Sequence, residues 1–210
     1  MEASPSLNRP ADVQRGQRLE YFTVVYNSLE GLIAIVSGAA AGSVALVGFG
    51  LDSLVEVTSG AALLWRLKRD ARAREHAERL SLHIVGWCFL ALAAYVAYDS
   101  LSSLIRREAP ERSLPGIILA AVSLVVMPLL ARAKRRVAQR ISSAALSADA
   151  RQTDFCTYLS AILLAGLLLN ALLGWWWADP LAGLVMTPLI ATEGIGALSG
   201  KTCCPSADCH

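Results

Sequence analysis

Six long apolar runs, each close to the length of a membrane-spanning helix, limit what this chain can fold into more than any other feature. A helix needs about 20 mainly apolar residues to cross the hydrocarbon core of a bilayer. Hydrophobic residues make up 55% of the sequence and charged residues 17%, against roughly 45–50% and 25% in soluble domains. Most of the charged residues lie in four polar stretches: 1–20, 66–79, 105–113 and 131–140. This clustering excludes a small water-soluble globule and disorder over the whole chain.

We expect the apolar runs to form six transmembrane helices, over residues 21–40, 43–65, 82–104, 114–130, 147–174 and 180–198. Isolated strands would leave backbone groups unpaired in lipid, and the sequence does not have the short alternating segments typical of a membrane barrel. The expected fold class is therefore an all-α membrane protein. Its parts are a cytoplasmic amino tail (1–20), a six-helix transmembrane domain (21–198) and a short cytoplasmic tail rich in Cys and His (199–210).

The distribution of Lys and Arg predicts how the chain is oriented. Three basic residues precede the first run, six lie in the second connection and five in the fourth. The third connection has three, and the first and fifth have none. By the positive-inside rule both termini then face the cytoplasm, which suits an even number of spans. We expect the chain to lie in a plasma (inner) membrane. The formal net charge of +2 gives no reason to expect nucleic-acid binding.

Acidic side chains inside the apolar runs need a functional explanation, because a charge at the bilayer centre costs about 2.5–3.5 kcal/mol. The informative polar and acidic residues lie in the first, second and fifth runs: Asn27, Glu30, Asp52, Glu56, Asp149 and Asp154. Any one of them can be a packing group that hydrogen-bonds to Ser or Thr. A spaced pair of carboxylates at depth is harder to explain by structure alone.

Asp52 and Glu56 form such a pair. They are four residues apart, so both carboxylates lie on one helix face, about 5–6 Å apart at Cβ. Like charges this close repel in a low dielectric, so we expect the pair to bind either protons or a metal ion. Helix rise places Glu30, Asp52 and Glu56 roughly 12–18 Å from the cytoplasmic side, near the midplane where transporters bind substrates. Asp154 lies nearer the cytoplasmic end and would need a tilted or longer fifth helix to join them.

Three segments resemble the cation diffusion facilitator transporters. The stretch SGAAAGSVALVGFGLDSLVEVTSGAALLWRL is similar to their first and second spans, and SSAALSADARQTD and WWWADP are similar to the segments that open their fifth and sixth spans. The resemblance covers roughly residues 20–200. It implies six helices around a midplane metal site, usually in a homodimer, that moves divalent cations such as zinc out of the cytoplasm in exchange for protons.

The resemblance also implies a set of metal ligands. Asp52 and Glu56 match the second-span pair, and Asp154 matches the acidic residue of a fifth-span His-x-x-x-Asp pair. Ala150 stands where that His is expected, so the site needs another ligand. The candidates are Glu30, Asn27, Gln152, Asp149 and water. Most members carry a cytoplasmic domain after the sixth span, and this chain is a short form that ends soon after it, which leaves dimerisation open.

The sequence contains two sets of possible metal ligands with different chemistry, so it does not identify the ion. Oxygen ligands from Asp and Glu suit Mn(II) and Fe(II) as well as Zn(II). The carboxyl-terminal segment offers softer ligands in Cys203, Cys204, Cys209 and His210, which suit Zn(II), Cd(II) or Cu(I). We expect Zn, Mn, Fe, Co or Cd to be a transported ion, with no resident cofactor.

Three functions compete on this evidence. The first is secondary transport, in which a divalent ion displaces protons from the buried carboxylates. The second is a metal sensor or modulator that binds but does not transport. The third is an intramembrane hydrolase in which Asp52 faces Asp154, but the sequence has no nucleophile or phosphate-loop motif to support it. We expect a transporter rather than an enzyme, with the lipid bilayer, a divalent ion and protons as its partners.

Overall fold

Each predicted span forms a helix in the computed structural model, which describes residues 9–67 and 71–199. In chain order the helices are α1 (Arg9–Ala41), α2 (Val44–Leu67), α3 (Ala71–Arg106), α4 (Leu114–Ile141), α5 (Ala144–Leu173) and α6 (Ala178–Leu198). All six are long and apolar enough to cross a membrane. The predicted all-α fold with six transmembrane helices is therefore confirmed.

Three helices extend well beyond the apolar runs that predicted them, and one of these is α3, which begins at Ala71 rather than near residue 82. α1 begins at Arg9 rather than near residue 21, and α4 continues to Ile141 rather than ending near residue 130. The flanking polar stretches are rich in Arg, Lys, Gln and Ala, which are strong helix formers. As a result Glu20 and Lys134, which the sequence placed in a tail and a connection, are fully buried in the bundle.

Short connections make antiparallel neighbours of α1 and α2, of α4 and α5, and of α5 and α6. Gly42 joins α1 to α2 with a φ of +66°, a left-handed conformation that glycine adopts without steric cost. Between α4 and α5, the Ser143 hydroxyl caps α5 by accepting a hydrogen bond from the backbone N–H of Leu146, at 3.3 Å. Gly174, with a φ of +67°, ends α5 in the same way that Gly42 ends α1.

The start of α2 is held by a residue from α6. Asp179, buried in the WWWADP segment, accepts hydrogen bonds from the Ser43 hydroxyl at 2.5 Å and from the Val44 backbone N–H at 3.0 Å. A carboxylate at this position satisfies a helix amide that has no partner in its own helix and complements the positive end of the helix dipole. The acidic residue of this segment therefore has a structural role.

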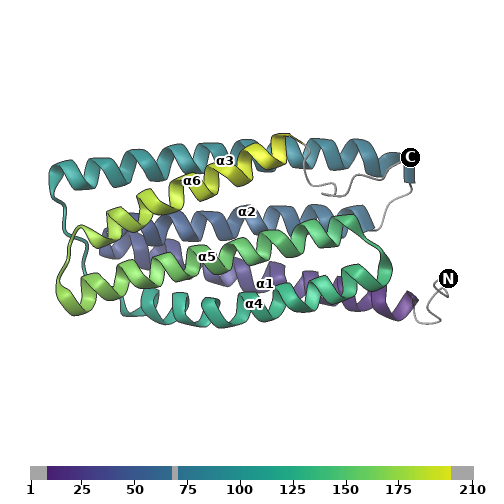
Figure 1. Cartoon of the computed structure of the whole chain (residues 1–210), viewed down its shortest axis with the longest axis horizontal. Coiled ribbons are helices and arrows are strands. Elements are labelled where there is room, and N and C mark those ends of the chain that lie inside the picture. The colour runs from purple at the N-terminus through teal and green to yellow at the C-terminus, as the bar shows by residue number, and fades with distance from the viewer. Residues whose placement is uncertain (1–8, 68–70, 200–210) are drawn as a thin grey trace.

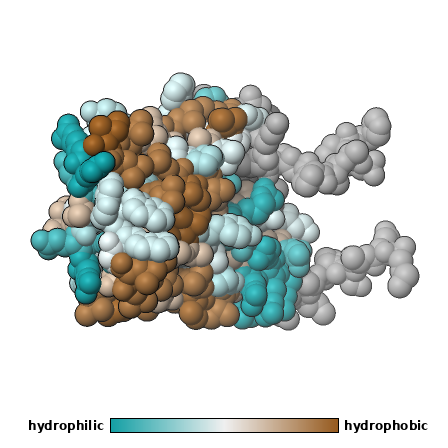
Figure 2. Space-filling model, turned by 60° about the vertical axis from the view of Figure 1, so that its left-hand side comes forward, coloured by the Kyte–Doolittle hydropathy of each residue, from teal (hydrophilic) through white to brown (hydrophobic). Residues whose placement is uncertain are grey.

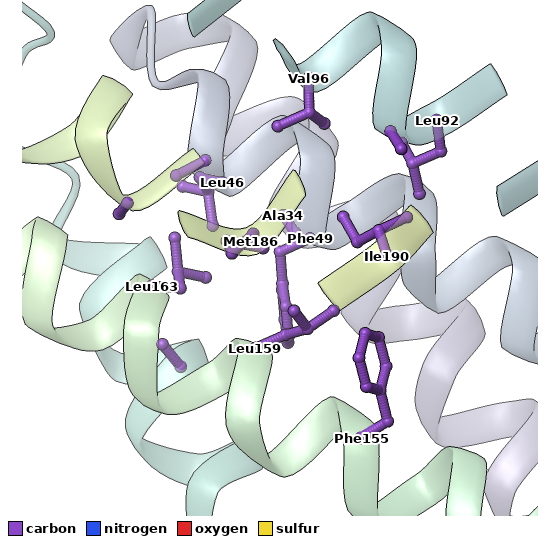
Figure 3. Close-up of a cluster of buried hydrophobic side chains, with 14 of the residues drawn as sticks. Ala34, Leu46, Phe49, Leu92, Val96, Phe155, Leu159, Leu163, Met186 and Ile190 are labelled. Carbon is purple, nitrogen blue, oxygen red and sulfur yellow. The ribbon is translucent and has the colours of Figure 1, made fainter. Parts of the chain in front are cut away.

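The six helices pack as pairs around a central apolar core. α2 and α5 lie between the pair α1 and α4 on one side and the pair α3 and α6 on the other (Figure 1). Large side chains from four helices meet in this core (Figure 3), among them Leu46, Phe49, Val96, Leu159, Leu163 and Met186. Close packing of α1 on α2 requires small residues, because a Cβ added at Gly50 would lie 2.9 Å from the Cβ of Ala34.

The outer surface has the character expected of a protein surrounded by lipid. Figure 2 shows hydrophobic residues across the middle of the molecule and hydrophilic residues gathered toward its two ends. Large apolar side chains point outward along the helices, including Leu29, Leu32, Val36, Ile105 and Leu172. In water such a surface would be strongly unfavourable, whereas in a bilayer it contacts acyl chains. The chain is an integral, multi-pass membrane protein.

Candidate metal site and the buried polar cluster

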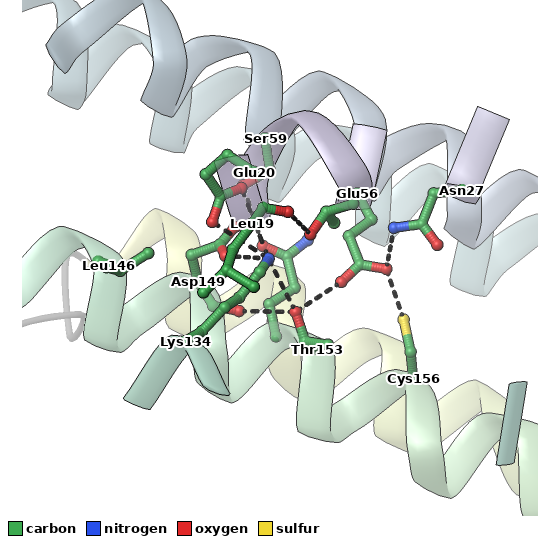
Figure 4. Close-up of polar contacts among 12 residues, drawn as sticks. Leu19, Glu20, Asn27, Glu56, Ser59, Lys134, Leu146, Asp149, Thr153 and Cys156 are labelled. Atoms are coloured by element: carbon green, nitrogen blue, oxygen red, sulfur yellow. Dashed lines mark hydrogen bonds and ion pairs between the residues drawn. The ribbon is translucent and has the colours of Figure 1, made fainter. Parts of the chain in front are cut away.

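Asp52 and Glu56 point into the bundle. Their exposed fractions are 2% and 1%, so neither carboxylate faces lipid. The thiol of Cys156, on α5, lies within hydrogen-bonding distance of both, with Sγ 3.3 Å from Asp52 Oδ2 and 3.0 Å from Glu56 Oε2. Asn27 of α1 donates a hydrogen bond from Nδ2 to the same Glu56 oxygen at 2.7 Å (Figure 4). Three helices thus bring polar groups to one point between α2 and α5.

Glu30 is buried, but hydroxyl groups hold it. The Ser53 hydroxyl donates to Glu30 Oε2 at 2.9 Å, and the Ser123 hydroxyl of α4 donates to Oε1. Tyr26 extends this chain through a 2.8 Å hydrogen bond between its hydroxyl and that of Ser123. In this arrangement Glu30 joins α1, α2 and α4 and makes no hydrogen bond to Asp52 or Glu56.

Asp154 does not join this cluster. Its carboxylate receives two hydrogen bonds from the Arg135 guanidinium, at 2.6 and 3.0 Å, and its side chain is 26% exposed. Two residues along a helix correspond to about 200° of rotation, so Asp154 and Cys156 lie on opposite faces of α5. The structure therefore places Cys156, rather than the expected Asp154, beside Asp52 and Glu56.

The spaced pair on α5 that faces α2 begins two residues later than the sequence suggested. Gln152 and Cys156 are four residues apart, and the Ser59 hydroxyl of α2 donates to Gln152 Oε1 at 3.0 Å. The sequence prediction used Ala150 and Asp154 instead. The spacing of polar residues along α5 could have indicated the face that meets α2, because Asp149, Thr153, Cys156 and Ser160 recur every three or four residues and are buried together.

A second polar cluster lies nearer one end of the bundle and includes two residues that the sequence prediction missed. The Lys134 ammonium lies 2.5 Å from Asp149 Oδ2 and 3.2 Å from Glu20 Oε1. Lys134 and Glu20 are fully buried. The signal in the sequence was again the spacing along α4, since Ser123, Met127, Leu130 and Lys134 repeat every three or four residues and are all buried.

The cluster beside α2 contains oxygen and sulfur atoms of the kinds that bind metal ions, but they are not arranged as a metal site in this conformation. Within residues 9–67 and 71–199, no three His, Cys, Asp or Glu side chains are arranged to hold a metal ion. In this conformation the Cys156 thiol acts as a hydrogen-bond donor to the carboxylates, and Asn27 Oδ1 is buried without a hydrogen-bond partner. The four tail candidates, Cys203, Cys204, Cys209 and His210, lie outside the described residues.

Comparison with known proteins shows similarity to cation efflux proteins and to transporters. Residues 21–199 match the cation efflux transmembrane domain. An uncharacterized transporter of Methanocaldococcus jannaschii is 27% identical over 177 residues, which cover 80% of this chain and 62% of that protein. An uncharacterized transporter of Synechocystis sp. is 28% identical over 156 residues, which cover 70% of this chain and 50% of that protein. The chain thus spans one half to about three fifths of the lengths of these relatives.

Proposed function

Because this chain belongs to the cation efflux family, we propose that it carries divalent metal cations out of the cytoplasm in exchange for protons. Membership of the family supports the transport of metal cations, as the resemblance implied. The choice of ion, the proton exchange and the direction are our inferences. A homodimer remains an expectation from the resemblance.

The observation that carries this proposal is the meeting of Asp52 and Glu56 with Cys156 across the α2–α5 interface. Glu56 lies 11 residues from the end of α2 and Cys156 lies 12 residues from the start of α5. A rise of 1.5 Å per residue puts both roughly 16–18 Å deep, near the centre of a ~30 Å core. A cation site at that depth can be reached from either side by a small change in helix packing.

The ligand types narrow the expected ions. Two carboxylates and a thiolate form a mixed set, and the sulfur favours Zn(II), Cd(II) and Co(II) over Mn(II). The ligand set expected from the sequence contained only oxygen atoms, and such a set does not favour Zn(II), Cd(II) or Co(II) over Mn(II). We propose that Asp52, Glu56 and Cys156 bind the ion, and that Asn27 positions the Glu56 carboxylate from the side of α1.

Proton exchange follows from the charges of these groups. Two carboxylates four residues apart on one helix repel each other when no cation lies between them. A divalent ion that enters has to displace the thiol proton and any proton held by the carboxylates. Protons that arrive from the other side displace the ion in turn, so the same groups serve both substrates.

The direction of transport rests on the orientation of the bundle. We define the basic end as the end where α1 begins and α4 joins α5, beside Arg135, Arg136 and Arg140 (Figure 1). Lys- and Arg-rich ends face the cytoplasm in membrane proteins. We propose that the basic end is cytoplasmic, and that ions enter the site from there.

Flux of Zn(II) or Cd(II) into proteoliposomes with an imposed pH gradient tests the function. We expect Asp52→Asn and Glu56→Gln each to lower the flux at least about tenfold, because each removes a charged ligand. Asp154→Asn is the matched control, since it neutralises a carboxylate on α5 that is bound to Arg135 instead. Wild-type flux in the Asp52 and Glu56 variants would overturn the proposal, and metal binding without flux in the wild type would indicate a sensor.

A further inference from the structure

Lys134 lies at the centre of a buried cluster that the proposed transport site does not use. Its side chain is inaccessible to solvent, and its ammonium contacts Glu20 of α1 and Asp149 of α5. The Thr153 hydroxyl, one turn further along α5 from Asp149, lies 3.2 Å from the same nitrogen. Figure 4 shows these groups converging on Lys134 from separate helices.

One ammonium cannot balance two ionised carboxylates, so a neutral cluster has to hold one more positive charge, either a proton or a cation. Two carboxylates surround one ammonium, and a buried ion pair already costs several kcal/mol of desolvation. Asp149 Oδ1 and Glu20 Oε1 are both buried, and neither accepts a hydrogen bond from a donor group of the described residues. Glu20 Oε1 takes part in the ion pair with Lys134. A structural ion pair would need one carboxylate. The second carboxylate gives the cluster the capacity to bind a cation in place of that proton.

The cluster is connected to the proposed metal site through one hydroxyl group. Thr153 Oγ1 lies 3.1 Å from Glu56 Oε1 as well as 3.2 Å from Lys134 Nζ. Asp149 precedes Cys156 by seven residues, which places it about 10 Å nearer the basic end. A cation that moved along this face of α5 from the basic end would therefore meet Glu20 and Asp149 before Glu56.

We propose that Glu20 and Asp149 form an inner cation site in which the transported divalent ion and the Lys134 ammonium compete. This inference rests on the proposed transport function. A divalent ion would take the two carboxylates and the Thr153 hydroxyl as ligands and complete its shell with water. When no ion is bound there, the Lys134 ammonium lies between the two carboxylates, so a divalent ion has to displace it before it binds.

Mn(II) binding to the purified full-length chain in detergent, followed by electron paramagnetic resonance, tests the inner site. The background is Asp52→Asn with Glu56→Gln, which removes the carboxylates of the proposed transport site. In this background we expect Lys134→Met to tighten Mn(II) binding at least about tenfold, because the competing charge is lost. Addition of Glu20→Gln should abolish the gain. Lys134→Arg is the matched control, since it keeps the charge and should not tighten binding.

Unchanged Mn(II) affinity in the folded Lys134→Met chain would overturn the inner site. If that variant does not elute as a folded protein, Asp149→Asn in the otherwise native chain gives a second test. We expect it to lower the initial rate of Cd(II) uptake by vesicles several-fold while the affinity at Asp52 and Glu56 stays the same. An unchanged rate would also overturn the inner site. Failure of the transport function is distinct, because the wild-type chain would then move no divalent ion into vesicles.

Discussion

Cys156 of α5 points its thiol at the Glu56 carboxylate of α2, with Sγ 3.0 Å from Oε2. Neither group is exposed to lipid or to the membrane surface. The contact joins two helices that are far apart in the sequence and fixes the α5 face that belongs to the site. In the proposed site it would add a soft ligand where the sequence suggested oxygen ligands alone.

Replacement of Cys156 is expected to change the preference among ions. Cys156→Ser keeps the size and the hydrogen bond but removes the sulfur, so we expect the ratio of Cd(II) to Mn(II) uptake to fall at least about tenfold. Vesicle uptake from a panel of single metals measures this ratio. Cys88→Ser is the matched control, because Cys88 is an exposed free cysteine on α3. Equal ratios in both variants would mean that the thiol is not a ligand.

Removal of the Lys134 charge is expected to destabilise the fold. Lys134→Met leaves Glu20 and Asp149 buried without a counter-charge, which costs about 3–5 kcal/mol for a buried pair. The triple variant Lys134→Met, Glu20→Gln, Asp149→Asn should recover most of that loss, since all three charges disappear together. Unfolding in mixed detergent micelles measures the change. A triple variant that is no more stable than Lys134→Met would show that packing, not charge, dominates at this cluster.

Loss of the cap at the start of α2 is expected to have a smaller effect. Asp179→Ala removes the acceptor for the Ser43 hydroxyl and the Val44 amide, and we expect a loss of about 1–2 kcal/mol in the free energy of unfolding. Asp179→Asn keeps an oxygen acceptor and should lose less. The same unfolding assay distinguishes the two variants. Equal stability of Asp179→Ala and the wild type would argue against a capping role.

Close contact of α1 and α2 predicts a large difference between two glycine substitutions. Gly50→Ala would place a Cβ 2.7 Å from Ile35 Cγ1 and 2.9 Å from the Ala34 Cβ, so α1 has to shift. Overpacking of this kind costs about 1–3 kcal/mol. Gly196→Ala on α6 is the control, because an added Cβ there meets nothing within 4 Å. Thermal denaturation in detergent compares them, and equal midpoints would contradict the contact.

The sequence predicted the number and the approximate positions of the helices because length and hydropathy are local properties. It also predicted that Asp52 and Glu56 share one helix face, which follows from their spacing alone. It did not predict which face of α5 meets α2, since helix rotation is set by packing between elements. The expected ligand set contained Asp154 rather than Cys156, because the sequence prediction placed the spaced pair of α5 two residues too early to face α2.

Lys134 and Glu20 escaped prediction for a different reason. Both lie in polar stretches, and such stretches are usually solvated. Their burial depends on how far α1 and α4 continue beyond the apolar runs and on how the two helices pack with α5. Hydropathy does not report this packing, although the three- and four-residue repeat of buried positions along α4 does.

The contact of Asp179 with Ser43 and Val44 has a mechanical consequence. It ties the first turn of α2 to the first turn of α6 at the end opposite to the one rich in Lys and Arg. If α2 moved away from α5 at that end, α6 would have to move with it, or the hydrogen bonds of Asp179 to Ser43 and Val44 would break. The freer half of α2 is therefore the half that carries Glu56, and we expect the larger rearrangements of the pathway there.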